Sequence, residues 1–305
     1  MRAPSQPVPD SAAPDPSLFV RVMPGLFVVL WATGFIGARM AAPGSDPLTF
    51  LFVRFALAGV ILLVAALVGG AAWPRGGRAI LDSLIAGALI HGGYLGAVFW
   101  AIYHGLPAGI AALIVGMQPL LTGLLAGPVL GETVTRAHWL GLVIGLVGLT
   151  LVLGPKLEFG GTGITPLTVG VTLFAVLCIV VGSIWQKARS AHADLRAGTA
   201  IQYLGAAVVV GVGALATESL RIDWTGEVIF AMAWLVLVLS IGAVLLYMAL
   251  IRRGAVAKLA TLFYLVPPVT ALIAWPLFGE TLTPVQIGGM VVTVAGVALA
   301  TRVKG

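Results

Sequence analysis

The third apolar stretch of the chain carries two side chains that are able to bind a ligand. His91 and Tyr94 lie three residues apart and Val98 follows four residues later, so all three share one face of a helix. An imidazole and a phenol on that face offer hydrogen bonds and an aromatic surface together. Polar side chains in an apolar helix are costly unless they face protein or water. We therefore predict that this face contacts a small ligand.

Other apolar stretches hold polar or aromatic residues that suit the same role: Gln118, Trp185, Ser240, Tyr247 and Tyr264. Ser240 and Tyr247 are seven residues apart, which puts them on the same helix face. Tryptophan and tyrosine near the ends of membrane spans also act as interfacial anchors. An anchoring role is therefore the alternative for Trp185 and Tyr247.

Two basic residues fall within or beside apolar stretches. Arg54 lies inside the second stretch and Lys258 at the start of the ninth. Long basic side chains near span ends usually extend to the membrane interface. A charged contact with a ligand is the alternative for both.

Three prolines occupy equivalent positions in the two halves of the chain. Pro119 lies in the fourth apolar stretch, and Pro267 and Pro268 lie in the ninth. A proline in a spanning helix frees a backbone carbonyl, which protein or a water-filled cavity has to satisfy. These prolines are either kinks for close packing or helix hinges that line a cavity.

The composition indicates an integral membrane protein. Hydrophobic residues make up 60% of the 305 residues and charged residues 9%, whereas about a quarter of a soluble domain is charged. Ten apolar stretches are each long enough to cross a hydrocarbon core of roughly 30 Å as a helix. They run near residues 19–38, 48–69, 80–103, 108–130, 136–154, 165–186, 197–216, 228–250, 257–278 and 284–302.

Basic residues concentrate in alternate loops. If the N-terminus is cytoplasmic, the outside loops hold only Arg39, Lys156 and Arg221 among the basic residues. The positive-inside rule then places both termini on the cytoplasmic side. The expected location is a bacterial-type inner membrane. Residues 1–17, rich in Pro, Ser, Ala and Asp, are predicted to be a disordered cytoplasmic tail. The net charge of +6 is thus explained by the basic residues of the cytoplasmic loops, and no nucleic-acid partner is expected.

The chain repeats itself at a constant offset of 148 residues. Residues 118–135 align without a gap to residues 266–283, and both segments contain the motif Gly-Glu-Thr. Each unit holds five spans, and an odd number inverts the second unit relative to the first. The predicted fold class is an all-α integral membrane protein with ten transmembrane helices, arranged as two inverted five-helix repeats around a central cavity. The two repeats extend over residues 18–155 and 164–303.

The usual signatures of catalysis, cofactor binding and metal binding are missing from the sequence. There is a single cysteine, Cys178, and there is no Walker loop, zinc-spaced histidine cluster or Gly-x-Ser-x-Gly motif. No cofactor and no metal site are predicted. No Asp or Glu lies deep in a predicted span, so the carboxylate relay of many proton-coupled pumps is missing too.

Several motifs resemble those of the drug/metabolite transporter superfamily, in the branch with two tandem EamA-type repeats. They are Leu30-Trp31-Ala32-Thr33-Gly34-Phe35, Arg54-Phe55-Ala56-Leu57-Ala58 and the repeated Pro-x-x-Thr followed by Gly-Glu-Thr-x-Thr. Within the superfamily the chain is similar to the YddG-type bacterial exporters of aromatic and other neutral amino acids. The resemblance implies a basket-like bundle with a central cavity lined by spans one, three, four, six, eight and nine. Gln202 stands where the first repeat has Arg54, which argues against a symmetric role for that arginine.

These features predict a membrane transporter and not an enzyme. Its expected activity is export of small metabolites, with aromatic or neutral amino acids as the leading substrates, by alternating access between the repeats. Efflux of cationic drugs, held by cation–π attraction, is one alternative, and a membrane-embedded enzyme or a scaffold is another. The expected partners are a small-molecule substrate and the lipid bilayer, and no oligomeric state is predicted. Facilitated diffusion and proton antiport through His91 are both compatible with the sequence.

Overall fold

The computed structural model describes residues 18–41, 44–106, 108–156, 163–190, 193–279 and 282–302. In these residues the backbone is helices and turns, apart from an isolated β-bridge between Ser45 and Ile222. The prediction of an all-α protein is therefore confirmed. The predicted disordered tail, residues 1–17, lies outside the described residues, as do Glu280 and Thr281.

The described residues of the first half form five helical segments. They are α1 (Leu18–Ala41), α2 (Pro47–Val68), a third segment, a fourth segment and α7 (Arg136–Leu153), which ends in the short turn η3 (Gly154–Lys156). The third segment consists of α3 (Gly77–Gly87), the π-helical stretch η2 (Ala88–Gly93) and α4 (Tyr94–Tyr103). The fourth consists of α5 (Ala108–Val115) and α6 (Gln118–Leu130).

The second half follows the same order. It comprises α8 (Pro166–Trp185) with η4 (Gln186–Ser190), α9 (Leu195–Thr217), α10 (Gly226–Trp234) with η5 (Leu235–Ala243) and α11 (Val244–Arg253), α12 (Val256–Thr261) with η6 (Leu262–Leu265) and α13 (Val266–Phe278), and α14 (Pro284–Arg302). Each predicted span therefore corresponds to one helical segment, with ends that differ by a few residues.

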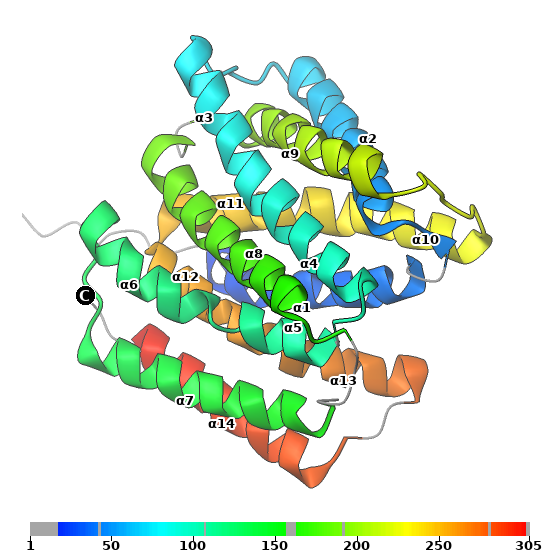
Figure 1. Ribbon diagram of the computed structural model, residues 1–305. Helices are drawn as coiled ribbons and strands as arrows, with labels where there is room; N and C mark the ends of the chain where they lie inside the picture. Colours follow the sequence, from blue (N-terminus) through cyan, green and yellow to red (C-terminus); the bar gives the residue numbers. More distant parts are fainter. Residues whose placement is uncertain are drawn as a thin grey trace, which may run out of the picture.

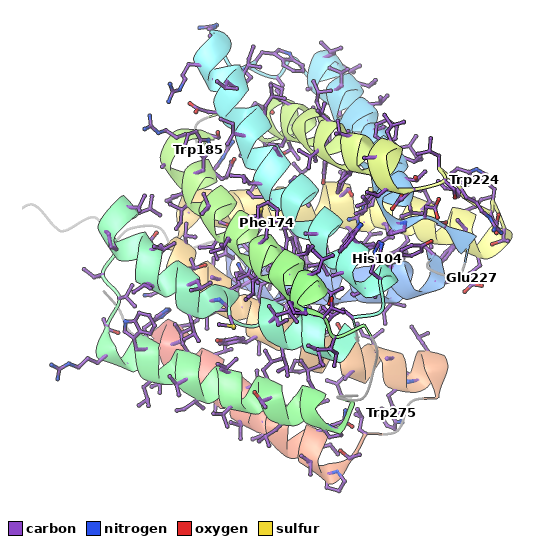
Figure 2. All side chains as sticks on the ribbon, in the orientation of Figure 1. His104, Phe174, Trp185, Trp224, Glu227 and Trp275 are labelled. Atoms are coloured by element: carbon purple, nitrogen blue, oxygen red, sulfur yellow. The ribbon has the colours of Figure 1, made fainter. Side chains whose placement is uncertain are left out.

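The lengths and surfaces of these segments suit a bilayer. Nine segments of the described residues, 18 to 28 residues long, are apolar enough to cross a membrane, and α1 adds a helix of 24 residues. Large apolar side chains project outward, such as Phe174 at 56% and Trp275 at 57% exposure (Figure 2). Such exposure is unfavourable in water and favourable against lipid tails. The chain is a multi-pass membrane protein.

The irregular points of the backbone obey the same 148-residue offset as the sequence. The π-helical stretches η2 and η5 interrupt the third and eighth spans at equivalent depths. The fourth and ninth spans both break near their middle, at residues 116–117 and at η6. Gly131 and Gly279 end α6 and α13 with left-handed φ angles of 69° and 65°. The duplication is therefore visible in backbone geometry as well as in residue type.

Figure 1 shows the inversion of the second repeat. Helix α6 ends on the left of the bundle, whereas its equivalent α13 ends on the right. Equivalent helices also pack against each other, α2 along α9 and α7 along α14. The two repeats are thus joined by two pairs of symmetry-related helices at opposite sides of the bundle.

Glycines let α7 and α14 approach closely. A methyl group at Gly141 would lie 2.6 Å from the carbonyl oxygen of Gly296, and one at Gly148 would lie 2.8 Å from that of Gly289. Gly141 and Gly148 are equivalent to Gly289 and Gly296, so the two contacts exchange roles as a two-fold relationship requires. This seam holds the last helices of the two repeats together.

Candidate functional site

A buried polar group lies where the two repeats meet. Arg54, near the middle of α2, is only 3% exposed, and its Nε donates a hydrogen bond to Ser240 Oγ in η5 at 2.9 Å. The Tyr203 hydroxyl, from α9, donates to the Ser240 backbone carbonyl. The π-helical geometry of η5 positions Ser240 so that both of its oxygens face side chains of the α2–α9 pair. We call Arg54, His91, Tyr203 and Ser240 the polar centre.

Aromatic rings enclose the polar centre. Phe55 and Tyr203 stack with centroids 5.6 Å apart, and the His91 ring lies 5.0 Å from that of Tyr203. The Arg54 guanidinium carbon is 5.7 Å from the centre of the Phe55 ring. His91 is 1% exposed, and its Nε2 has no hydrogen-bond partner in the described residues. A buried nitrogen without a hydrogen bond in the polar centre is a group that a ligand could satisfy.

A pair of side-chain amides lies next to the polar centre. Gln202 Nε2, in α9, donates to Gln186 Oε1, in η4, at 2.9 Å. Gln202 Oε1 is buried and has no partner among the described residues. Gln202 is the equivalent of Arg54, so the same depth of the second repeat carries a neutral amide where the first carries a cation.

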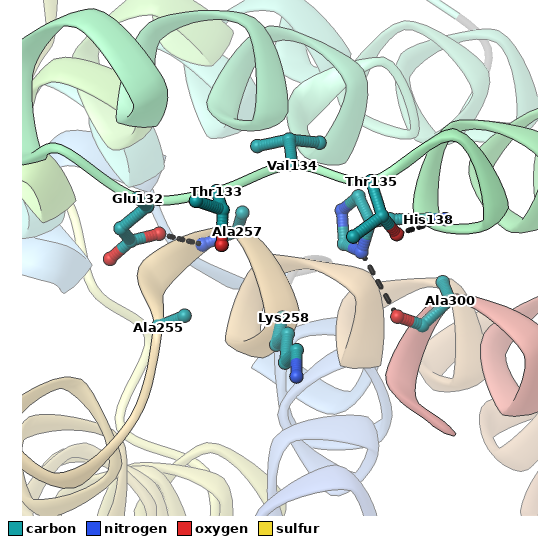
Figure 3. A pocket seen from close by; sticks show the side chains of 9 residues that line it. All are labelled: Glu132, Thr133, Val134, Thr135, His138, Ala255, Ala257, Lys258 and Ala300. Carbon is teal, nitrogen blue, oxygen red and sulfur yellow. Dashed lines mark hydrogen bonds between the residues drawn. The ribbon is translucent and has the colours of Figure 1, made fainter. Parts of the chain in front are cut away.

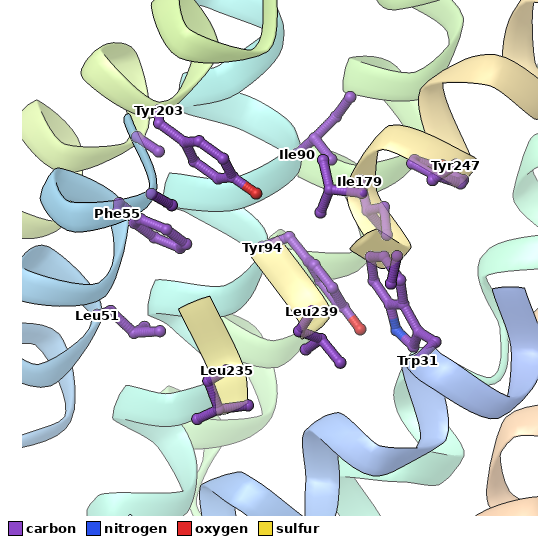
Figure 4. Packing of buried hydrophobic residues seen from close by; sticks show 14 of the residues in the cluster. Trp31, Leu51, Phe55, Ile90, Tyr94, Ile179, Tyr203, Leu235, Leu239 and Tyr247 are labelled. Atoms are coloured by element: carbon purple, nitrogen blue, oxygen red, sulfur yellow. The ribbon is translucent and has the colours of Figure 1, made fainter. Parts of the chain in front are cut away.

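Four rings form an aromatic box on the α1 side of the bundle. Phe27 and Trp31 from α1, Tyr247 from α11 and Phe263 from η6 have neighbouring centroids 5.2 to 5.7 Å apart. The Tyr247 hydroxyl shares a hydrogen bond of 2.7 Å with Ser183 Oγ. In Figure 4, Tyr94 lies between Tyr203 and Trp31, with its hydroxyl directed toward the indole. Tyr94 thus connects the polar centre to the aromatic box.

The structure brings together several predicted residues and separates others. His91, Tyr94, Ser240, Tyr247 and Arg54 all line the core between the repeats. Trp185 instead lies at the end of α8, where its Nε1 donates to the Asp82 carbonyl of α3 at 3.1 Å (Figure 2).

Gln118 and Tyr264 lie at the breaks of the fourth and ninth spans. The amide atoms of Gln118 and the hydroxyl of Tyr264 are buried and have no hydrogen-bond partner within the described residues. The Tyr264 ring packs beside α7, where a methyl group at Gly145 would come within 2.6 Å of it, and so it faces away from the aromatic box. Gln118 and Tyr264 are therefore not part of the same ring cluster as Tyr247.

The predicted hinge prolines begin the second halves of the broken spans. Pro119 lies in the first turn of α6, and Pro267 and Pro268 lie in the first turn of α13. Proline is well tolerated there because the first N–H groups of a helix have no partner within the helix. The prolines thus mark breaks between two helices.

Lys258 lines a pocket at one end of the bundle. Figure 3 shows this pocket between the 131–135 loop, the start of α12 and the end of α14, with Glu132 and His138 in its wall. The Glu132 carboxylate accepts hydrogen bonds from the backbone amides of Val256 and Ala257 at 2.8 and 3.1 Å. Lys258 therefore lies near the membrane surface and not beside Arg54.

Sequence reasoning missed four residues of this region: Phe27, Trp31, Tyr203 and Phe263. Phe27 and Trp31 are four residues apart and so share a helix face, which was an available signal. Trp31 also belongs to the motif that carries the family resemblance. Tyr203 is the equivalent of Phe55, so applying the repeat offset to the Arg54-Phe55 motif would have found it.

Two inverted five-span repeats around a buried polar and aromatic centre are the architecture of a membrane transporter. The sequence pattern of the EamA-like transporter family matches residues 25–154 and again residues 167–302, and the chain belongs to that family. The predicted resemblance to the drug/metabolite transporter superfamily is thereby confirmed, and so is the prediction of a transporter and not an enzyme.

Individual relatives cover most of the chain. It is 30% identical over 278 residues to the "Uncharacterized inner membrane transporter YedA" of Escherichia coli (strain K12), over 90% of this chain and 88% of YedA. It is 27% identical over 282 residues to a "Probable amino-acid metabolite efflux pump" of Salmonella typhimurium, over 89% of this chain and 91% of the pump. A crystal structure of another protein superposes with a TM-score of 0.77 at 21% identity, covering 92% of this chain and 96% of that one, which shows the shared fold.

Proposed function

We propose that the protein exports small metabolites, with aromatic or neutral amino acids as its substrates, by alternating access between the two repeats. The observation that carries this proposal is the pairing of the polar centre with the aromatic box. Hydrogen-bonding groups at one end and stacked rings at the other suit a molecule with a polar head and an apolar or aromatic side chain. Among the predicted binding residues, His91, Tyr94, Ser240 and Tyr247 lie in this region.

The broken spans supply the proposed moving parts. Pro119, Pro267 and Pro268 begin half-helices at equivalent depths, and such breaks commonly let one half of a transporter helix swing relative to the other. The repeats would extend over residues 18–155 and 164–303 and rock about the α2–α9 and α7–α14 pairs. Both termini would face the cytoplasm, and the location would be the inner membrane, as the name of YedA states for that relative.

Efflux of cationic drugs is the competing function, and Arg54 argues against it. A buried guanidinium repels a cationic ligand in the low-dielectric core. An aromatic box alone would bind a cation by cation–π attraction, but here the nearest buried ionic group has the same sign as the drug. An amino acid also carries an ammonium group, but its carboxylate is attracted by the guanidinium and offsets that repulsion, whereas a purely cationic drug has no such group.

Transport by the purified protein in liposomes tests the proposal. We expect saturable uptake of labelled aromatic amino acids and little uptake of a cationic drug. Because no acidic side chain has been identified in the centre, we expect this flux to persist without a proton gradient. Uptake of the cation alone would favour drug efflux, and a flux that requires the gradient would favour antiport through His91.

The variants His91→Ala and Tyr94→Ala separate a binding role from a packing role. Loss of flux in protein that still folds and reconstitutes would support a substrate contact. Loss of folded protein would indicate that these side chains only fill the core. Leu140→Ala on α7 is the control, because Leu140 is 56% exposed and belongs to neither the polar centre nor the aromatic box.

A further inference from the structure

The Arg54 guanidinium is a buried cation, and within the described residues it has no ion-pair partner. Its single side-chain hydrogen bond in the described residues goes to the neutral Ser240 hydroxyl, and none of the ion pairs in that part of the chain involves it. A guanidinium presents five N–H donors in a planar fork, so most of the donors of Arg54 are left for another partner.

An isolated buried charge is strongly disfavoured unless something compensates it. An anionic ligand would provide that compensation, and a carboxylate matches the fork of a guanidinium with two parallel hydrogen bonds. Resting on the proposed export function, we infer that Arg54 binds the carboxylate of the substrate, and that the site selects for this carboxylate and not for an ammonium group.

His91 is a second group that points to a ligand. Its Nε2 is buried and makes no well-aligned hydrogen bond in the described residues, although the Gln202 side chain lies close enough to interact with the imidazole. Its ring contacts Tyr203, which is hydrogen-bonded to the Ser240 carbonyl. A neutral imidazole donates a proton from one nitrogen, so His91 can add a hydrogen bond to a carboxylate bound by Arg54. Arg54, Ser240 and His91 together form a carboxylate site built from three spans.

No comparable site for an ammonium group is found in the described core. The buried carboxylates there are Asp46, directly before α2, and Asp82, in the second turn of α3. Both lie toward the ends of their spans and not at the depth of Arg54. An ammonium group near Arg54 would thus meet a like charge and find no carboxylate, and it contributes little or negatively to binding.

The aromatic box lies at a distance that suits the rest of the molecule. Ser240 and Tyr247 are seven residues apart in the eighth span, which corresponds to about 10 Å along its axis. A ligand whose carboxylate binds at Ser240 and Arg54 can therefore place an apolar or aromatic group, a few bonds away, against Tyr247 and Trp31. Aromatic carboxylates with a short chain fit both ends.

Three compounds that share a phenylethyl skeleton test the inference: L-phenylalanine, 3-phenylpropionate and 2-phenylethylamine. Their binding is measured by thermal stabilisation of the purified full chain in detergent and by competition with L-phenylalanine flux in liposomes. We expect 3-phenylpropionate to bind at least roughly tenfold more tightly than 2-phenylethylamine. Equal or tighter binding of the amine would overturn the inference.

Substitution of Arg54 assigns the effect to one side chain. We expect Arg54→Gln, which installs the residue of the equivalent position in the second repeat, to weaken 3-phenylpropionate at least roughly tenfold, and Arg54→Lys to recover part of the loss. Arg253→Gln is the matched control, because Arg253 is exposed at the end of α11, and its binding should equal that of the wild type. If Arg54→Gln does not fold, Ser240→Ala and the ranking of the three compounds on the wild type still decide.

The same experiment distinguishes failure of this inference from failure of the proposed function. If no amino acid is transported but 3-phenylpropionate stabilises the wild type and not Arg54→Gln, amino-acid export is wrong and the carboxylate site is correct. If L-phenylalanine is transported and Arg54→Gln binds it and 3-phenylpropionate as the wild type does, export is correct and the carboxylate site is wrong.

Discussion

Phe55 and Tyr203 stack on each other across the boundary between the repeats, with ring planes inclined by 15°. They are 148 residues apart, which is the offset of the duplication, so the stack lies on the pseudo-two-fold axis. Their neighbours on the N-terminal side, Arg54 and Gln202, do not match. The symmetry that builds the scaffold is thus broken at the position where a charge would select the ligand.

Tyr203→Phe should destabilise the protein although it keeps the ring stack. The Tyr203 hydroxyl is the side-chain donor to the Ser240 carbonyl, and its removal deletes one buried hydrogen bond, at a cost of about 0.5–1.5 kcal/mol. Tyr203→Leu should cost more because it removes the ring as well. Thermal unfolding in detergent measures both variants, and equal stability of the wild type and Tyr203→Phe would show that the hydrogen bond is unimportant.

Gly296→Ala should weaken the seam between α7 and α14. A methyl group there would lie 2.4 Å from the backbone nitrogen of Gly145, and a backbone atom cannot move aside as a flexible side chain can. We expect a loss of about 1–3 kcal/mol from this overpacking. Gly288→Ala in the same helix is the control, because nothing lies within 4 Å of its added methyl group. That control should be neutral or slightly stabilising, since alanine favours helix over glycine.

The sequence predicted the spans and the repeat because both are one-dimensional signals. A membrane sets the length of an apolar helix, and a duplication leaves a fixed offset between matching residues. His91 and Tyr94 were chosen as residues three apart on one face of a regular helix. Both are buried between the repeats, although His91 lies in the π-helical stretch η2, directly before α4.

The arrangement of the aromatic box was harder to predict, because it depends on local changes of helical pitch. In the ninth span the 3₁₀ turn η6 changes the phase of the helix, so that Phe263 faces Trp31 while its neighbour Tyr264 faces α7. Sequence reasoning chose Tyr264 on its polarity and depth. The direction in which each of these side chains points follows from a backbone irregularity that the apolar pattern does not encode.

Two glutamates connect the repeats at opposite ends of the bundle. Glu218, after α9, accepts hydrogen bonds from the Leu48 and Thr49 amides at 2.7 Å and so caps α2, while Glu132 caps α12. A carboxylate at a helix N-terminus satisfies free N–H groups and the helix dipole. Each cap therefore ties a helix of one repeat to a loop of the other repeat at its own end of the bundle.

Glu132→Ala should loosen the contact between the 131–135 loop and α12, and leave the contact at Glu218 on the opposite end of the bundle intact. A cysteine at Ala257, which is 3% exposed and hydrogen-bonded to Glu132, reports this opening through its rate of reaction with a thiol reagent in a Cys178→Ala background. We expect faster labelling with Glu132→Ala. Glu218→Ala removes the cap at the opposite end of the bundle and should leave the labelling rate unchanged or lower it. Equal acceleration by both variants would indicate general loosening and not a local latch.

Asp46→Asn should reduce stability in a pH-dependent way. The Arg221 backbone amide and the Ser219 hydroxyl, which donate to Asp46 Oδ2 at 3.0 and 2.7 Å, hold the pKa of the Asp46 carboxyl below its ordinary value of 3.8. A lowered pKa means that the ionised form stabilises the fold above the unfolded pKa, and that this stabilisation is lost as the pH falls through the folded value. The wild type should therefore be more stable than Asp46→Asn near neutral pH, and the difference should shrink below about pH 4.

Thermal unfolding in detergent from neutral pH to about pH 3 checks this expectation, since the two transition temperatures should converge only in the acidic range. Glu227→Gln is the matched control because it removes one negative charge from the same end of the bundle, at an exposed position in the first turn of α10. It tests whether net charge alone produces the effect. A difference in transition temperature between wild type and Asp46→Asn that stays constant down to the lowest pH would contradict the expectation. It would mean that the amide accepts the same hydrogen bonds, and that the charge of Asp46 contributes nothing to joining the loop before α2 to the loop between α9 and α10.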